Sequence, residues 1–134
     1  MKRIHRILLT IITFVLISGS SCETDNEWGP GISGTWTCQE ESLIRGYRQY
    51  KVNIERNNAD TSVYRVFNFH NLGFEIEVYI KLADTVITFL PPSSEISISG
   101  TGKVNKAMSD IYLEYSIIGL DLVENDIQAH YYRR

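Results

Sequence analysis

The amino-acid sequence predicts an all-β protein, specifically an eight-stranded antiparallel up-and-down barrel, and three observations favour this fold. From Ile32 onward, apolar residues recur with a period of two rather than 3.6. Turn-forming residues separate eight such runs. No stretch has the length and pattern of an amphipathic helix that could connect parallel strands. We therefore expect consecutive strands to pair and the sheet to close, which removes its exposed edges. A two-sheet β-sandwich is the alternative.

The expected strands are short and lie close together in the chain. They span residues 34–41, 48–55, 62–69, 74–82, 85–90, 95–104, 110–118 and 125–132. The clearest alternation is in 74–82, where one face carries Phe74, Ile76, Val78, Ile80 and Leu82. The other face carries Glu75 and Glu77, so we expect one side in the core and one in water. In 62–69 both faces are apolar, which indicates that the outer face also contacts something.

The start of the chain has the pattern of an export signal. Lys2, Arg3 and Arg6 are followed by an apolar run over 7–17 and then by small residues. This run is too short to remain as a membrane span, which takes about 20 apolar residues. The expected organisation is a lipoprotein signal peptide over 1–21, a flexible tether over 22–31 and one barrel domain over 32–134.

The small residues that end in Cys22 resemble the lipobox of bacterial lipoproteins, although Gly19 stands where leucine is most common. The acidic start over 23–27 is similar to that of surface lipoproteins of the Bacteroidota. This resemblance implies that Cys22 carries the lipid and that the protein is an outer-membrane lipoprotein of the cell envelope, exposed at the surface. A plain secretory signal is the alternative, and it would leave Cys22 free to pair with Cys38.

The balance of charge argues against nucleic acid as a partner. The chain of 134 residues has 13 Lys and Arg against 16 Asp and Glu. Three of the basic residues leave with the signal, so the remaining ten give the mature chain a formal charge near −6. Nucleic-acid binding needs a basic face for the phosphates, so we expect none here.

A motif at the first strand indicates how the barrel is closed. Gly34 and Trp36 form a Gly-x-Trp sequence at the start of the first expected strand, and Arg133 follows the last one. This arrangement resembles the lipocalin/calycin pattern, which implies that Trp36 plugs the closed end and that Arg133 stacks on it. A guanidinium can lie on an indole face while it donates hydrogen bonds to carbonyl groups.

The sequence offers little that points to catalysis or to a bound metal. His70 and His130 have no metal-ligand spacing, and no nucleophile motif is present. Glu75 and Glu77 are more simply the wet face of a strand, and Cys38 shares the inward parity of Trp36. We expect no enzyme activity, no cofactor and no metal.

Aromatic residues are the remaining positive feature. Possible ligand or rim contacts are Tyr50, Tyr64, Phe69, Tyr115 and Tyr131. They favour a monomeric, membrane-anchored barrel that binds a small apolar or aromatic ligand at its mouth. The alternative is a barrel filled by its own side chains that serves as an accessory or interaction subunit of a cell-surface complex.

Overall fold

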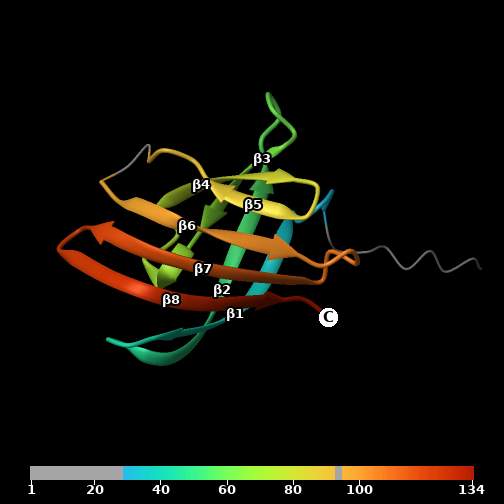
Figure 1. Cartoon of the computed structure of the whole chain (residues 1–134). Helices are drawn as coiled ribbons and strands as arrows, with labels where there is room; N and C mark the ends of the chain where they lie inside the picture. Colours follow the sequence, from blue (N-terminus) through green and yellow to red (C-terminus); the bar gives the residue numbers. More distant parts are fainter. Residues whose placement is uncertain (1–28, 93–94) are drawn as a thin grey trace, which may run out of the picture.

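The protein is a closed barrel of eight antiparallel strands, seen in a computed structural model that describes residues 29–92 and 95–134 (Figure 1). The strands are β1 (Gly34–Ser42), β2 (Gly46–Arg56), β3 (Val63–Phe67), β4 (Glu77–Ala83), β5 (Val86–Phe89), β6 (Ser97–Val104), β7 (Asp110–Gly119) and β8 (Leu122–Tyr132). Each pairs with the next along the chain, and β8 pairs with β1. The predicted barrel is confirmed.

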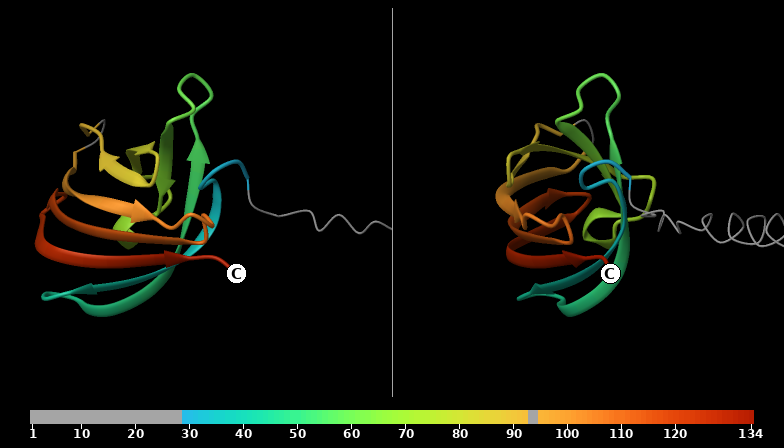
Figure 2. Two further views of the ribbon diagram at one scale, coloured as in Figure 1. Left: turned by 45° about the vertical axis from the view of Figure 1, so that its right-hand side comes forward. Right: turned by 90° about the vertical axis from the view of Figure 1, so that its right-hand side faces the viewer.

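The up-and-down order gives the barrel two unlike ends. The β1–β2, β3–β4, β5–β6 and β7–β8 connections lie at one end, which we name the mouth end. The other three connections lie at the opposite, closed end, together with the first described residues and the C-terminus (Figures 1 and 2). Among the residues of both described ranges, no helix is long and apolar enough to cross a membrane.

Alternating side chains fill the barrel interior. Along β7, Ile111, Leu113, Tyr115 and Ile117 are buried, and between them lie residues that face outward. The largest side chains that solvent does not reach include Trp36, Tyr64, Phe69 and Tyr131. A barrel of eight strands is only just wide enough for its own side chains, so these aromatic groups occupy the interior.

The β3–β4 region differs from the sequence prediction. β4 begins at Glu77 rather than at residue 74, and Phe74, expected in the core, is 59% exposed. β3 ends at Phe67, and a short 3-10 helix, η1 (Phe69–Asn71), takes the place of the last predicted strand residues. The reason lies in the backbone, because Asn68, His70 and Asn71 all have a positive φ that a strand cannot contain.

Asn68 holds this reversal together through its side chain. Its Nδ2 donates to the carbonyl of Lys51 at 2.7 Å, and its Oδ1 accepts from the amide of Gly73 at 2.9 Å. Asparagine tolerates the left-handed conformation because its short side chain bonds the local backbone. The chain therefore turns over the mouth before β4 begins.

Candidate interaction site at the barrel mouth

Trp36 and Arg133 close the end of the barrel opposite the mouth. Trp36 is fully buried, its Nε1 donates to the carbonyl of Ile32 at 2.8 Å, and the guanidinium of Arg133 lies 4.2 Å from the ring centroid. Arg133 also donates to the carbonyls of Gly31, Ser33 and Met108 at 2.7–2.9 Å. Burial lowers the pKa of Arg133 from its usual value. Gly34 opens β1 beside this plug, so the tryptophan and the arginine seal this end.

At the mouth end, a buried carboxylate organises a polar network inside the barrel. Glu40 continues the inward row of Trp36 and Cys38 along β1, and solvent does not reach its side chain. Its Oε2 accepts hydrogen bonds from Tyr50 at 2.5 Å and from Tyr115 at 2.6 Å. Its Oε1 pairs with Arg48. Both oxygens are thus satisfied, as a buried charge requires.

Hydrogen bonds decide the ionisation of this carboxylate. Burial by itself would raise the pKa of Glu40, but the hydrogen bonds from His70, Tyr115 and Tyr50 outweigh it and lower the pKa to about 2. Burial raises the pKa of Tyr50 and of Tyr115 well above its usual value. The two phenols are therefore neutral donors to a permanently charged acceptor at physiological pH.

His70, in the β3–β4 connection, covers the interior of the barrel at the mouth end. It projects from η1 and is fully buried, with Nδ1 2.8 Å from the hydroxyl of Tyr115 and 3.0 Å from Oε1 of Glu40. Its Nε2 lies 3.5 Å from Oε1 of Glu124 on β8. The neighbouring Phe69 packs against the rings of Phe89 and Tyr115, with centroids 5.7 Å and 4.8 Å away. One short turn thus plugs the barrel with an apolar and a polar group.

The β1–β2 connection is tied to the same network. Nε of Arg45 lies 2.6 Å from Oε1 of Glu124, whose side chain is 1% exposed. Neither oxygen of Glu124 accepts a hydrogen bond of good geometry from the described residues, so the contact with Arg45 is chiefly one of charge. A buried carboxylate without a counter-charge destabilises the fold. The contact with Arg45 therefore favours the position of the β1–β2 connection against β8.

The side chains predicted as ligand or rim contacts lie in two different places. Tyr64, Phe69 and Tyr131 pack within the hydrophobic core, and Tyr50 and Tyr115 belong to the polar network around Glu40. The hydroxyl of Tyr131 has no hydrogen-bond partner among the described groups. These five residues fill the barrel. Cys22, the predicted lipidation site, lies outside the described residues.

Exposed apolar side chains gather around the plugged mouth. Of the nine large apolar side chains that are exposed in the described ranges, seven lie at the mouth end: Leu43, Ile44, Tyr47, Phe74, Ile118, Leu120 and Val123. We name these seven residues the rim. Leu43 is 88% exposed at the tip of the β1–β2 connection, and Ile118 lies opposite Val123 on the β7–β8 hairpin. Exposed apolar side chains that gather at one end of a molecule are a candidate interaction surface.

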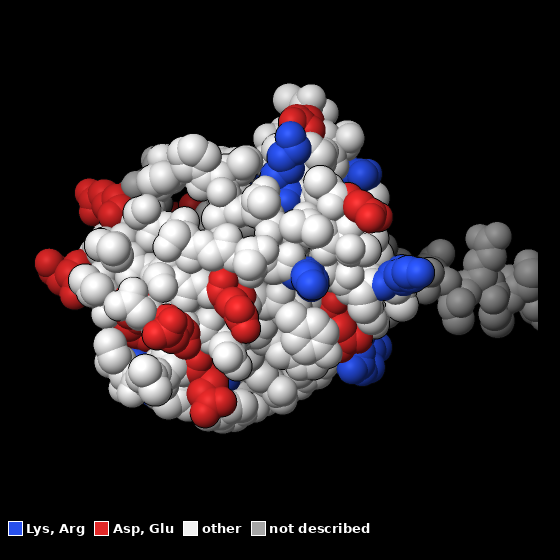
Figure 3. Space-filling view, viewed as in Figure 1, with Lys and Arg blue, Asp and Glu red and all other residues white. Residues whose placement is uncertain are grey.

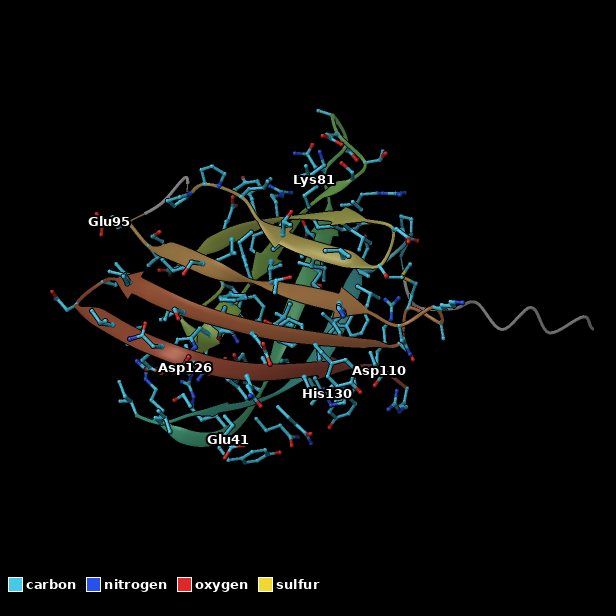
Figure 4. The ribbon with its side chains drawn as sticks, in the orientation of Figure 1. Glu41, Lys81, Glu95, Asp110, Asp126 and His130 are labelled. Atoms are coloured by element: carbon cyan, nitrogen blue, oxygen red, sulfur yellow. The ribbon has the colours of Figure 1, made fainter. Side chains whose placement is uncertain are left out.

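The charge around the rim is acidic. Glu75, Glu95 and Asp121 are exposed in the mouth-end connections, whereas the two arginines there, Arg45 and Arg48, face buried carboxylates. In Figure 3 the acidic side chains predominate toward the side where the β5–β6 and β7–β8 connections lie, and most basic ones lie toward the opposite end. Figure 4 places Glu95 at that same end.

The described residues hold no group of three or more His, Cys, Asp or Glu side chains that could bind a metal ion. His70 and His130 lie in separate places, since His70 is in the buried network and His130 is on the outer wall beside Asp110. Cys38 is a buried free thiol, and burial raises its pKa to about 12.

Sequence reasoning missed Glu40, His70 and Glu124. A signal for Glu40 was present, because it lies two residues after Cys38 on the inward face of β1. Glu124 carried no such signal, since a register shift between Tyr115 and Ile117 breaks the alternation of β8 against β7. His70 lies in a turn, where alternation says nothing about burial.

Comparison with known protein families found no family that matches this chain. Comparison with curated proteins likewise found no matching relative.

Proposed function

We propose that this protein is an envelope-anchored interaction module, a filled lipocalin-like barrel that docks a partner protein of a cell-surface complex through its rim. The observation that carries the proposal is the location of seven of the nine exposed large apolar side chains at the mouth end. Apolar groups supply most of the free energy of protein association. A monomer in water gains nothing from such an arrangement.

The buried network supports this role because it makes the rim rigid. Arg45 ties the β1–β2 connection to β8, and His70 ties the β3–β4 connection to β1 and β7. Loops that already have their bound conformation lose less entropy when they bind. The polar network is thus a brace under the docking surface.

The acidic charge around the rim indicates which kind of partner surface would fit it. Exposed Glu75, Glu95 and Asp121 surround the rim, and the nearby arginines are engaged internally. Complementary charge raises the rate of association and excludes wrong partners. The matching surface is therefore an apolar patch flanked by Lys or Arg side chains.

The anchor supports the same orientation. Gly29, the first described residue, lies at the closed end, because it adjoins Ser33, which bonds Arg133 there. A lipid on Cys22 therefore tethers the closed end and leaves the rim directed away from the membrane. Incorporation of labelled palmitate by the wild-type chain and not by Cys22→Ala tests this anchor, and equal labelling of the two would exclude it.

Binding of a small apolar ligand inside the barrel remains a prediction from the aromatic residues. The positions of Tyr64, Phe69 and Tyr131 in the core and of His70 in the mouth favour the filled-barrel alternative. A ligand would have to displace both η1 and its hydrogen bonds to reach the interior.

Site-specific photocrosslinking in the native host tests the docking surface. A photoreactive phenylalanine analogue replaces Phe74 on the rim or, as the control, Val86, which is 43% exposed at the closed end. We expect Phe74 to give one discrete protein adduct that disappears when Leu43→Asp and Ile44→Asp are introduced. The same adduct from both positions, or one that survives the Asp substitutions, would contradict the proposal.

A further inference from the structure

A second surface with its own chemistry lies on the outer wall of the barrel, across β1, β8 and β7. A hollow of about 280 Å³ is present there, and its outward lining is Gln39, Glu41, Tyr47, Tyr112, Glu114, Gln128 and His130. The strand register arranges these side chains in rows, because Gln39 lies opposite His130 and His130 opposite Tyr112. None of these residues belongs to the buried network. Tyr47 also belongs to the rim, and the other six do not.

The hollow contains a fixed aromatic platform. Tyr112 is 56% exposed, and its ring lies parallel to that of His130, with centroids 4.5 Å apart and planes 2° apart. Nε2 of His130 lies 2.9 Å from Oδ1 of Asp110, which Arg134 and Ser109 also hold. Hydrogen bonds from these neighbours lower the pKa of Asp110, so it is a permanent anion that orients the imidazole. Figure 4 shows Asp110 and His130 together where β7 and β8 adjoin.

The second face of Tyr112 is available to a ligand. In the next strand, Lys103 lies opposite Tyr112, and between them a further hollow of about 240 Å³ is lined by Thr101, Lys103, Tyr112 and Glu114. His130 therefore covers one side of the ring and leaves the other side open.

Planar polar groups surround the platform. The amides of Gln39 and Gln128 and the carboxylates of Glu41 and Glu114 line the hollow, and within the described ranges neither carboxylate forms an ion pair. These groups offer donors and acceptors on a rigid sheet rather than on loops. Their hydrogen-bonding capacity exceeds what the wall itself uses.

We infer that this outer wall binds a carbohydrate. A sugar ring has one apolar C–H face that packs on an aromatic ring, and its neighbouring hydroxyl groups both donate and accept hydrogen bonds. The open face of Tyr112 supplies the aromatic surface. Glu114 lines the hollow beside that face, and Gln128 lies opposite Glu114 on β8, so that each supplies a planar group able to bond two hydroxyls. A purely apolar ligand would leave these polar groups unpaired.

The extent of the surface indicates an oligosaccharide rather than a single sugar. A neighbouring hollow of about 360 Å³ shares Glu114 and Gln128 with the first and continues over Ser99, Thr101, Ser116 and Asp126. The two hollows form a continuous polar track across β8, β7 and β6. Each further sugar ring along the track meets hydroxyl or carboxylate groups.

The test uses the full-length chain, purified from host membranes in detergent, and a panel of neutral hexasaccharides: cello-, malto-, xylo-, manno- and chito-oligosaccharides. Isothermal titration calorimetry is expected to detect binding of at least one of them. Tyr112→Ala should weaken that binding at least tenfold, whereas Tyr112→Phe, which keeps the ring, should stay within about threefold.

Tyr79→Ala is the matched control, because Tyr79 is an outward-facing tyrosine on β4, away from the hollow. It should leave binding unchanged, as should Leu43→Asp on the rim, which separates this site from the docking surface. No binding by any member of the panel, or equal weakening by Tyr112→Ala and Tyr79→Ala, would overturn the inference.

Discussion

At the scale of single residues, Glu40 couples the stability of the barrel to pH. Its pKa is about 2 in the folded chain against an ordinary value of 4.5, which corresponds to about 3 kcal/mol. Because the folded value is the lower one, this stabilisation is present above about pH 4.5 and is lost as the pH falls toward 2.

We predict that the free energy of unfolding of the wild type, measured by urea titration, falls steeply between pH 5 and pH 2.5. Glu40→Gln should make the free energy of unfolding depend less on pH over this range. Glu40→Gln should also lose about 2–4 kcal/mol at pH 7, since Arg48 is left without its carboxylate. Glu75→Gln, an exposed carboxyl at the mouth end, is the control. Parallel pH curves for wild type and Glu40→Gln would contradict this account.

Cys38 provides a second prediction at this scale. Burial raises the pKa of its thiol to about 12, and solvent does not reach the side chain. Only the thiolate attacks disulfide reagents, so the folded protein should react with such a reagent at pH 8 only as fast as it unfolds. The measurement uses Cys22→Ser, so that one thiol remains. Fast reaction of the folded protein would show that the barrel opens at β1.

The burial of Cys38 and Trp36 was predictable, because alternation along β1 is unbroken. Glu40 obeyed the same rule and was still missed, since a carboxylate at an inward position contradicts the expectation that charge faces water. What makes it tolerable is the set of donors from β2, β7 and η1, which are far apart in the sequence. Such a convergence is a tertiary property.

At the scale of the elements, the pairing of β6 with β7 depends on a glycine, Gly100, which lies opposite Tyr115. A Cβ on Gly100 would lie 2.1 Å from the carbonyl oxygen of Glu114 and 2.6 Å from Cα of Tyr115. Because these are backbone atoms, only a shift of a strand can make room.

Gly100→Ala should therefore destabilise the protein by more than 2 kcal/mol in urea unfolding. Gly46→Ala is the matched control, since Gly46 also has a positive φ but has open space around its Cβ position. Its loss should be about 1 kcal/mol, the usual cost of the left-handed conformation. Equal losses for the two variants would mean that the close approach is unimportant.

The sequence predicted all eight strands, with most ends correct to within a few residues. It was wrong where a polar residue controls the backbone locally, as at Asn68, whose side chain reverses the chain and starts η1. The apolar period through Phe74 and Ile76 continued past this turn and gave the impression of an earlier strand. Periodicity describes which face is apolar, but the turn decides where pairing begins.

At the scale of the whole molecule, Arg133 connects the end of the chain to the segment before β1 and to the β6–β7 connection. It joins Gly31, Ser33 and Met108 and covers Trp36. Arg133→Met should cost about 3 kcal/mol, because the buried carbonyl of Ser33 and the partly buried carbonyls of Gly31 and Met108 lose their donor. Arg133→Lys should recover little of this loss, since an ammonium cannot bridge three carbonyls while it lies flat on an indole.

Urea titration followed by fluorescence of Trp36 measures this effect in a Trp28→Phe background. Arg134→Met is the control, because Arg134 lies on the exposed side and bonds Asp110. Equal stability of Arg133→Met and wild type would show that the closed end holds without its arginine.

The hydrogen bonds between Arg133 and the residues before β1 also determine at which stage of synthesis the barrel can close. The partners are 100 and 102 positions apart in the sequence, and β8 must pair with β1 for the ring to exist. A chain that leaves the ribosome from its N-terminus therefore has an unpaired β1 edge until β8 has been made. Contacts at such sequence separation form slowly, so closure of the barrel has to wait for its last strand and is expected to be the slow step of folding.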